Sequence, residues 1–194
     1  MGIIPPVSDT TKSVKTTSIP GVFIIERPTF TDDRGFFHEV FRLNELEEVA
    51  GVDFKPVQWS HSFSKPGVIR AIHTEGWQKL IYPVTGHLFA AIADVRPDSA
   101  TFGKVEVFEM DNTKDSPHQA LFLPPGMGNS ICAVGDVGLH YLYLVDAYWD
   151  DAKATGIAWD DPDLAISWPI KDPSISERDT KNPTLRSLYP EKFK

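Results

Sequence analysis

The sequence predicts a mostly β protein with one domain, built as a jelly-roll barrel with a short helix and a C-terminal segment of turns and short helices. Strand-like runs follow one another closely, and 16 prolines and 13 glycines are spread along the chain, as expected for many turns. The intervals leave little room for the crossovers of a dozen or more residues that parallel strands need. A chain of 194 residues can bury one substantial core without disulfide or metal support.

The N-terminal part combines a polar arm with the first strands. Residues 1–18 are polar and lack periodicity, so we expect a loose arm before a single domain over residues 19–194. The apolar run at residues 22–25 predicts a strand. After a turn-like stretch at residues 31–33, the aromatic and β-branched residues 34–41 predict another.

A short helix follows these strands. Asn44 has the form of an N-cap, with Glu47 at the third helical position, and Gly51 provides a stop. The sequence therefore predicts one helix that ends at Gly51.

The middle of the chain reads as a series of strands. Residues 79–95 predict a strand, a turn at Thr85-Gly86 and a second strand, and further strands are expected at residues 104–110, 120–123 and 138–145. From residue 150 onward the chain is acidic and rich in proline, and it should wrap the barrel as turns and short helices. Its apolar anchors would be Ile157, Trp159, Leu164 and Ile166.

Composition excludes several classes of partner. The net charge of −8 argues against binding nucleic acid or an anionic membrane, although a local arginine cluster could still bind an anionic metabolite. Cys132 is the single cysteine, so no intramolecular disulfide can form. No signal-peptide core and no stretch of about 20 apolar residues is found, and we expect a cytoplasmic protein.

The first candidate for chemistry is His73, in the segment 70–73. On a strand, alternation would place Arg70 and Ile72 on one face and Ala71 and His73 on the other, so His73 could point into the mouth of a barrel. The structural alternative is a half-buried strand histidine with a satisfied hydrogen bond.

A metal site is not expected. The turn over residues 123–129 resembles the second half of the metal motif of metal-binding cupins, but Asn129 stands where their histidine would be. His73 lacks the second histidine of an H-x-H pair, because Thr74 and Glu75 follow it, so a His-rich site for Zn or Fe would be short of ligands.

Two other segments are ambiguous by themselves. Tyr141 and Tyr143 share one face of a strand, where paired tyrosines usually pack in a core with their hydroxyls at the rim. Residues 176–179, near the C terminus, read locally as a solvated turn with a helix-cap residue.

Together these segments resemble the dTDP-4-dehydrorhamnose 3,5-epimerases, in order and from about residue 19 to residue 185. The resemblance rests on several separate blocks: Asp33 to Glu39, Gln58 to Ser64, Val68 to His73, Lys79-Leu80, Asp94 to Arg96, Ser99 to Gly103, Pro125-Gly126, Tyr143, Asp161-Pro162, Trp168-Pro169 and Ser174 to Asp179.

The resemblance implies a homodimer of jelly-roll cupins that needs no metal or cofactor and acts on a dTDP-4-keto-6-deoxysugar. His73 matches the general base and Asp179 the carboxylate paired with it. Lys79 matches the cation beside oxygen O4, where enolate charge develops, and Tyr143 matches the general acid on the other face of the ring.

Further matches concern the nucleotide. Arg34 and Arg70 match contacts to the diphosphate, as suits a planar guanidinium. Phe37, Glu39 and Gln58 match residues around the nucleoside and phosphates. The thymine base is implied by the resemblance alone.

The presumed sugar pocket departs from the common pattern. Many members have glycine at Ala71, phenylalanine at Ile131 and histidine at Asn129, although some share the asparagine and the short spacing between His73 and Lys79. The positions that the resemblance places near the substrate are Ser60, where many members have asparagine, Asn129, Tyr148 and Trp149.

The leading hypothesis is epimerisation at C3 and C5 of dTDP-4-keto-6-deoxyglucose through an enolate, which a C4 ketone makes accessible. One alternative is an epimerase of a single carbon, C3 or C5, or of another nucleotide-linked 4-keto sugar. A second is a non-catalytic cupin that binds a ligand, and a third is a metal-dependent cupin oxygenase or isomerase, which the missing ligands disfavour.

Overall fold

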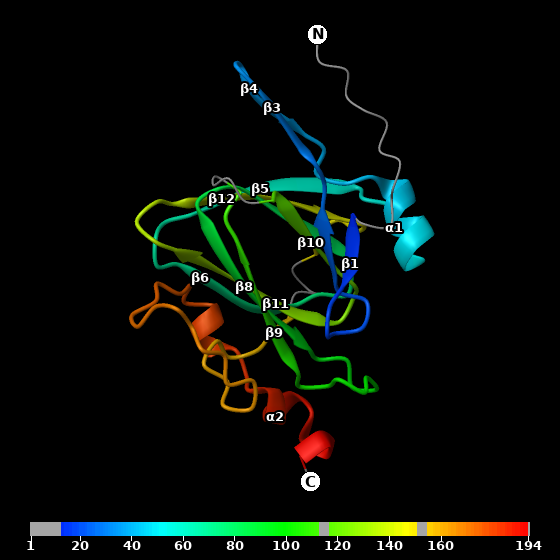
Figure 1. The fold of residues 1–194 in the computed structure, drawn as a ribbon. Helices are drawn as coiled ribbons and strands as arrows, with labels where there is room; N and C mark the ends of the chain where they lie inside the picture. The colour runs from blue at the N-terminus through cyan, green and yellow to red at the C-terminus, as the bar shows by residue number, and fades with distance from the viewer. Residues whose placement is uncertain (1–12, 113–116, 151–154, 194) are drawn as a thin grey trace.

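The computed structural model describes residues 13–112, 117–150 and 155–193, which form two antiparallel sheets packed face to face (Figure 1). The six-stranded sheet has the order β1 (Val14–Thr16), β2 (Phe23–Glu26), β10 (Gln119–Leu123), β7 (Lys79–Thr85), β12 (Leu139–Val145) and β5 (Gln58–Ser64). The five-stranded sheet has the order β13 (Thr155–Gly156), β6 (Ile69–Thr74), β11 (Met127–Val134), β8 (His87–Asp94) and β9 (Val105–Met110). The predicted jelly-roll fold, of the cupin type, is confirmed.

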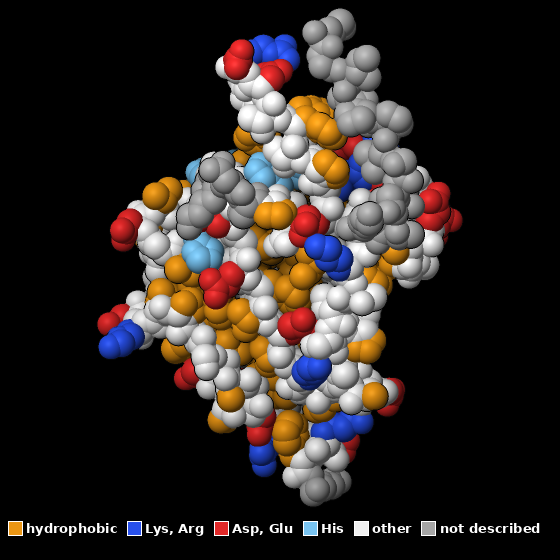
Figure 2. Space-filling model, viewed as in Figure 1, with side chains coloured by type: hydrophobic (Ala, Val, Ile, Leu, Met, Phe, Trp, Pro, Cys, Tyr) orange, Lys and Arg blue, Asp and Glu red, His pale blue; other side chains and the backbone are white. Residues whose placement is uncertain are grey.

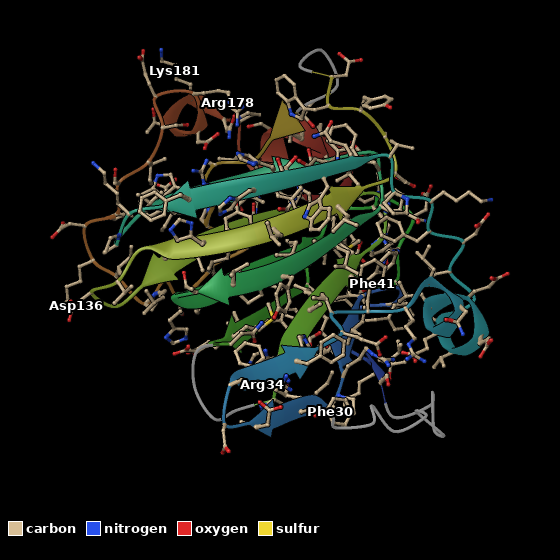
Figure 3. The ribbon with its side chains drawn as sticks, turned by 90° about the horizontal axis from the view of Figure 1, so that it is seen from above. Phe30, Arg34, Phe41, Asp136, Arg178 and Lys181 are labelled. Carbon is tan, nitrogen blue, oxygen red and sulfur yellow. The ribbon has the colours of Figure 1, made fainter. Side chains whose placement is uncertain are left out.

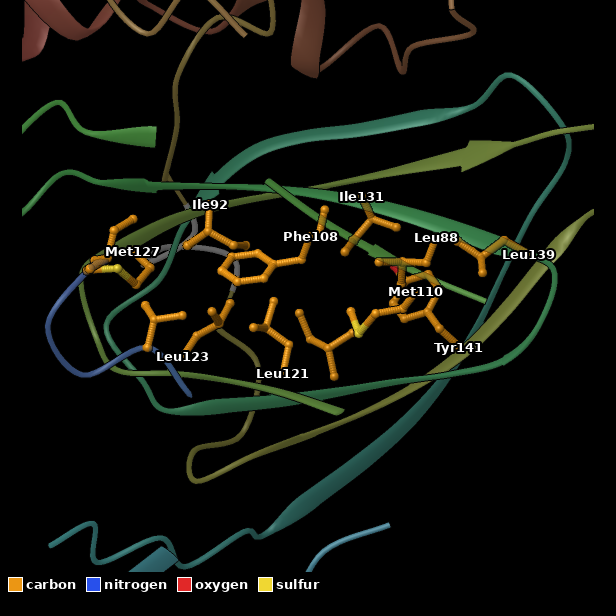
Figure 4. Packing of buried hydrophobic residues seen from close by; sticks show 14 of the residues in the cluster. Leu88, Ile92, Phe108, Met110, Leu121, Leu123, Met127, Ile131, Leu139 and Tyr141 are labelled. Carbon is orange, nitrogen blue, oxygen red and sulfur yellow. The ribbon is translucent and has the colours of Figure 1, made fainter. Parts of the chain in front are cut away.

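The main core lies between the two sheets (Figure 4). Alternate residues of each strand point inward, so Leu121 and Leu123 of β10 pack with Leu88 and Ile92 of β8. Burial of these side chains supplies the hydrophobic stabilisation of the barrel.

Both outer faces are partly covered. The helix α1 (Leu43–Ala50) and the segment after it pack on the six-stranded sheet through Leu46 and Phe54. The C-terminal segment packs on the five-stranded sheet through Ile157, Leu164 and Leu185, and Trp159 and Ile166 are partly buried there. It contains the short helices η3 (Asp179–Lys181), α2 (Leu185–Leu188) and η4 (Pro190–Phe193), so the predicted wrapping is confirmed.

A hairpin projects from the barrel. It consists of β3 (Thr29–Asp32) and β4 (Gly35–His38), which pair only with each other (Figure 1). The predicted strand over residues 34–41 is too long, because the observed strand β4 ends at His38. The predicted turn at residues 31–33 is also displaced, because Thr31 and Asp32 belong to β3. The turn falls at Asp33-Arg34 instead.

Two further expectations need correction. The helix begins at Leu43 after Arg42, which provides no side-chain cap, so Asn44 is not the N-cap; Gly51 does end the helix, with a positive φ of 65°. The strand β1 lies inside the predicted arm of residues 1–18 and pairs with β2, because Val14 is buried against Ile25. Residues 1–12 lie outside the described part of the chain.

The other predicted strands agree with β2, β7, β8, β9, β10 and β12 to within one or two residues. The turn at Gly86 has φ +86° and passes so close to Gly138 that a side chain would collide with its carbonyl oxygen. None of the described helices is long and apolar enough to cross a membrane. On the face shown in Figure 2, acidic and basic side chains are interspersed.

Candidate active site

A polar cavity of about 230 Å³ opens inside the barrel, between β7, β12 and β5 of one sheet and β6 and β11 of the other. The sequence-predicted site residues that line it are Gln58, Arg70, His73, Lys79, Asn129, Tyr143 and Trp149. A second cavity of about 300 Å³ adjoins the first and shares His73 with it, and Asp179 lines this second cavity. Residues from five strands, from the segment after β12 and from the C-terminal segment thus meet at one place.

An irregularity in β6 decides how this strand faces the cavity. Along β11, Asn129 faces His73 and Ile131 faces Arg70, so a single residue of β11 is matched by two residues of β6, Ala71 and Ile72. Such a bulge shifts the alternation by one position. Arg70 and His73 therefore both line the cavity, while Ala71 and Ile72 are buried. The prediction that Arg70 and His73 point to opposite faces is wrong.

The C-terminal segment brings a carboxylate to the histidine. Asp179 Oδ1 lies 3.2 Å from His73 Nε2, and the side chain of Asp179 is only 4 % exposed. Burial would raise the pKa of Asp179, but the hydrogen bond and positive charge of His73, with the Ser176 hydroxyl and Arg178, lower it to about 2. Asp179 is thus a carboxylate at neutral pH and can hold His73 in one orientation. The local interpretation of residues 176–179 as a solvated turn is wrong for Asp179.

Arg178 contacts the same histidine nitrogen. Its Nη2 lies 3.0 Å from His73 Nε2, and its Nε lies 3.3 Å from Asp179 Oδ1. Nε2 can either donate its proton to Asp179 or accept a hydrogen bond from Arg178, so the two contacts belong to different protonation states. When Nε2 carries the proton, Nδ1 is the nitrogen that can accept one.

Lys79 is a buried cation on the inner face of β7, with its side chain 9 % exposed. Its Nζ forms an ion pair with Glu75 Oε2 and lies 5.0 Å from the centre of the Tyr143 ring. The carboxylate offsets the cost of burying the ammonium group. The strand order places Lys79 and Tyr143 on neighbouring strands that face the same cavity.

Asn129 connects this ion pair to β6. Its Nδ2 donates to the main-chain oxygen of His73 at 3.0 Å and lies 3.4 Å from Glu75 Oε2. The side chain at this position is therefore a hydrogen-bond donor inside the cavity wall and is 5 % exposed.

The two tyrosines of β12 differ in burial. Tyr141 is buried in the main core, and burial raises the pKa of its hydroxyl. Tyr143 is partly buried. The centres of the Tyr141 and Tyr143 rings are 6.1 Å apart, and both rings line the cavity. Core packing and access to a ligand are thus combined in one face of the strand.

The remaining predicted residues of the barrel are Gln58, Arg70 and Trp149, which line the cavity, and Ser60 and Tyr148. Gln58 donates from Nε2 to Ser60 Oγ at 3.1 Å and accepts from the main-chain N–H of Trp149 at 3.0 Å. Arg70 donates to Ser64 Oγ and to the Phe63 main-chain oxygen, each at 2.9 Å. Ser60 and Tyr148 do not line the cavity.

Three predicted residues lie elsewhere on the chain. Arg34 is at the tip of the hairpin, where it pairs with Asp32 and is 84 % exposed, and Phe37 is exposed on β4. Figure 3 shows Arg34 on the side of the molecule opposite to Arg178, which lines the cavity. Glu39 pairs with Arg27 and Arg42 near α1. One chain therefore does not bring these three residues to its own cavity.

Several residues of the cavity are not predicted from the sequence, and three of them contact the predicted site residues or one another. Glu75 and Trp77 line the cavity from the loop between β6 and β7, and Arg178 lines it from the C-terminal segment. A signal was available for Glu75 and Trp77, since they lie between His73 and Lys79. No local pattern indicates that Arg178 reaches a histidine 105 positions away.

The arrangement can move protons. It combines a histidine oriented by a carboxylate, a buried lysine that can donate to an oxyanion, and a phenol on a neighbouring strand. Within the described ranges, no group of three or more His, Cys, Asp and Glu side chains is placed to hold a metal ion. This set suits removal of a proton beside a carbonyl group and its return at the same carbon.

The fold and this site define an epimerase of nucleotide sugars built on a cupin barrel. The sequence model of the dTDP-4-dehydrorhamnose 3,5-epimerases matches residues 16–187. The enzyme of that name from Shigella flexneri is 34 % identical over 168 residues, which cover 84 % of this chain and 90 % of the relative. The chain belongs to the dTDP-4-dehydrorhamnose 3,5-epimerase family.

Solved structures agree with this assignment. NovW, a 4-keto-6-deoxy sugar epimerase of Streptomyces spheroides, superposes with a TM-score of 0.86 at 30 % identity, covering 92 % of this chain and 90 % of that one. ChmJ, a 3'-monoepimerase of Streptomyces bikiniensis in complex with dTDP-quinovose, gives a TM-score of 0.83 at 31 % identity, covering 91 % and 89 %.

Proposed function

We propose that this cavity epimerises C3 and C5 of dTDP-4-keto-6-deoxyglucose (dTDP-4-dehydro-6-deoxy-D-glucose), giving dTDP-4-dehydro-L-rhamnose. The observation that carries the proposal is the meeting of His73, Asp179, Lys79 and Tyr143 around two adjoining cavities. Membership of the family supports the same reaction.

Each inversion follows from the acidity of hydrogens beside the C4 ketone. His73 removes a proton from the carbon, and Asp179 stabilises the imidazolium that forms. The electron pair moves toward oxygen O4, where Lys79 donates a hydrogen bond to the enolate. Tyr143 then gives its hydroxyl proton to the opposite face of the same carbon. The reaction needs no cofactor in this scheme, which stays a prediction.

Arg70, Gln58, Asn129 and Trp149 line the cavity and are proposed to bind the substrate. Ser60 and Tyr148 are proposed to bind it as neighbours of these residues in the chain. Arg70 is the guanidinium best placed to meet the diphosphate. Its guanidinium donates to the Ser64 hydroxyl and to the Phe63 main-chain oxygen. These two hydrogen bonds hold the planar guanidinium in one orientation.

The functional unit is proposed to be a homodimer in the cytoplasm. Two features support a second copy. Trp59 is 68 % exposed and Phe63 is also exposed on the outer face of the edge strand β5, an apolar surface of the kind that proteins cover by association. In addition, Arg34 lies on the side of the molecule opposite to Arg178 (Figure 3), and Phe37 is exposed on β4 and lines neither cavity, so we infer that both contact a substrate in another chain.

A single-carbon epimerase is the second candidate. Ile131 and Asn129 line the cavity, so two of the differences from the common family pattern lie at the presumed sugar pocket. Ala71 lies elsewhere, because it is buried between the five-stranded sheet and the C-terminal segment. Pocket shape decides which face of the enolate is reprotonated. The similarity to ChmJ, a 3'-monoepimerase, supports this second candidate.

The test is exchange with solvent. The protein is incubated in D2O with dTDP-4-keto-6-deoxyglucose, and the C3 and C5 proton signals are followed by NMR. Loss of both signals, with the L-rhamno product, supports the proposal; loss of one favours the single-carbon epimerase. Binding without exchange of any 4-keto sugar would favour the non-catalytic cupin.

Variants assign the roles in the same assay. His73→Ala should abolish exchange at both carbons, whereas Tyr143→Phe should still permit proton removal and slow the completed inversion. His87→Ala, on β8 and outside both cavities, is the matched control and should behave as the wild type. Turnover near wild type in His73→Ala would refute the assignment of the base.

A further inference from the structure

Glu75 is a carboxylate in the cavity wall to which the proton-transfer scheme gives no role. Three donors converge on its Oε2: the Lys79 ammonium, the Trp77 indole N–H at 3.1 Å and the Asn129 amide at 3.4 Å. Its side chain is only 13 % exposed. A carboxylate with three donors on one oxygen is held firmly.

The loop that carries Glu75 is fixed on two sides. The main-chain N–H of Gly126 donates to the Glu75 main-chain oxygen at 2.9 Å, which ties the loop to the turn before β11. The same Asn129 amide that approaches Glu75 donates to the main-chain oxygen of His73. The carboxylate is therefore placed relative to the backbone of the catalytic histidine.

Lys79 needs such a partner. A lysine side chain has a flexible four-carbon stem, so its ammonium can occupy many positions unless it is held. Here Nζ is buried, and the contacts found for it among the described residues are the ion pair with Glu75 and the face of the Tyr143 ring. Of these two, only the carboxylate opposes its charge.

We propose that Glu75 is a positioning residue that holds the Lys79 ammonium where it meets oxygen O4 of the substrate. This inference rests on the proposed function, because it assigns Lys79 to the enolate oxygen. Trp77 and Asn129 hold the carboxylate, and an ammonium has three donors, so Lys79 can keep the ion pair and still donate to the substrate.

The enolates formed at C3 and at C5 share the same oxygen, O4. Loss of Glu75 should therefore slow exchange at both carbons by the same factor, whereas a change in pocket shape would affect the two carbons unequally. Substrate binding depends mainly on other groups and should change little.

The experiment measures C3 and C5 exchange in Glu75→Gln, which keeps the shape and removes the charge. We expect kcat to fall about tenfold or more, as misplacement of a catalytic group does, with KM nearly unchanged and the ratio of C3 to C5 exchange preserved. In a Lys79→Met background, Glu75→Gln should cause little further loss, because its effect acts through Lys79. Glu109→Gln is the control, because Glu109 is an exposed carboxylate on β9 that pairs with His87 outside both cavities.

Other outcomes overturn the inference. Unchanged kcat in Glu75→Gln, a loss confined to one carbon, or an equal loss with and without Lys79 would each refute it. Should Glu75→Gln fail to fold, Glu75→Asp carries the same test, because it keeps the charge and withdraws the carboxylate from Lys79 by one bond. Absence of exchange in the wild type would instead overturn the proposed function, and the inference with it.

Discussion

At the scale of single residues, the neighbouring groups explain how Asp179 stays ionised beside His73 although it is buried. The carboxylate is almost fully enclosed, yet its pKa stays low because His73, the Ser176 hydroxyl and Arg178 favour its ionised form over the effect of burial. Ser176 Oγ also accepts from the main-chain N–H of Asp179 at 3.1 Å, which fixes the start of η3.

Asp179→Asn tests this pair. The variant keeps the size of the side chain but cannot stabilise an imidazolium, so exchange at C3 and C5 should fall by about 10² to 10⁴, with the larger loss in kcat. Steady-state rates by NMR in D2O provide the measurement. Glu177→Gln is a matched control, because Glu177 is a nearby acid whose exposed side chain pairs with Lys181 at the surface. Equal losses in both variants would contradict a specific role for Asp179.

At the scale of elements, His38 at the base of the hairpin contacts His118, which lies just before β10. The ring of His38 stacks on Tyr82 at 5.7 Å between centres and meets His118 edge-on at 4.8 Å. Burial, followed by the charge of His118, lowers the pKa of His38 to about 4, and Arg27 and Glu39 also act on it. Burial lowers the pKa of His118 too. The hairpin is thus joined to the barrel through groups that resist protonation.

This contact predicts how stability depends on pH. The pKa of His38 is 6.5 in the unfolded chain and about 4 in the folded protein. As the pH falls, the unfolded state therefore binds a proton at His38 before the folded state does. The contribution of His38 to the stability of the fold is therefore complete above pH 6.5 and is lost progressively as the pH falls from 6.5 to 4. His38→Phe, which can keep the ring contacts, should lose less stability than the wild type between pH 7 and 4.5 in urea unfolding. The same loss in both proteins would contradict the assignment to His38.

At the scale of the whole molecule, the hairpin and the cavity of one chain lie apart. Glu39 forms ion pairs with Arg27 and Arg42 near the base of the hairpin, while Arg34 at its tip pairs with Asp32. If a second copy receives the hairpin at its cavity, each active site contains residues of two chains.

A mixing experiment tests that arrangement. His73→Ala and Arg34→Ala should each be nearly inactive alone, but a mixed dimer would contain one site with both residues intact. Activity should therefore appear after the two variants are dissociated and reassembled together, with the dimer mass checked by analytical ultracentrifugation. Mixing His73→Ala with Asp179→Asn is the control: if the dyad belongs to one chain, the mixed dimer has no intact site and activity should not recover. Failure of the first pair to complement would contradict a shared site.

The fold and most of the cavity could be predicted from the sequence by itself. Alternation of apolar residues and turn signals indicate the strands locally, because backbone geometry and burial act over a few residues. The resemblance to a family added Lys79, Tyr143 and Asp179, and the structure places all three, with His73, around the two cavities.

The tertiary structure decided what depends on neighbours distant in sequence. The bulge opposite β11 turns Arg70 and His73 to the same side, and no alternation within β6 could reveal it. The converging donors at Glu75, the approach of Arg178 to His73 and the separation of Arg34 from the cavity likewise arise from packing between elements. Local sequence determined which residues form strands and carry chemistry, whereas pairing across the sheets determined which of them meet, because those contacts join segments far apart along the chain.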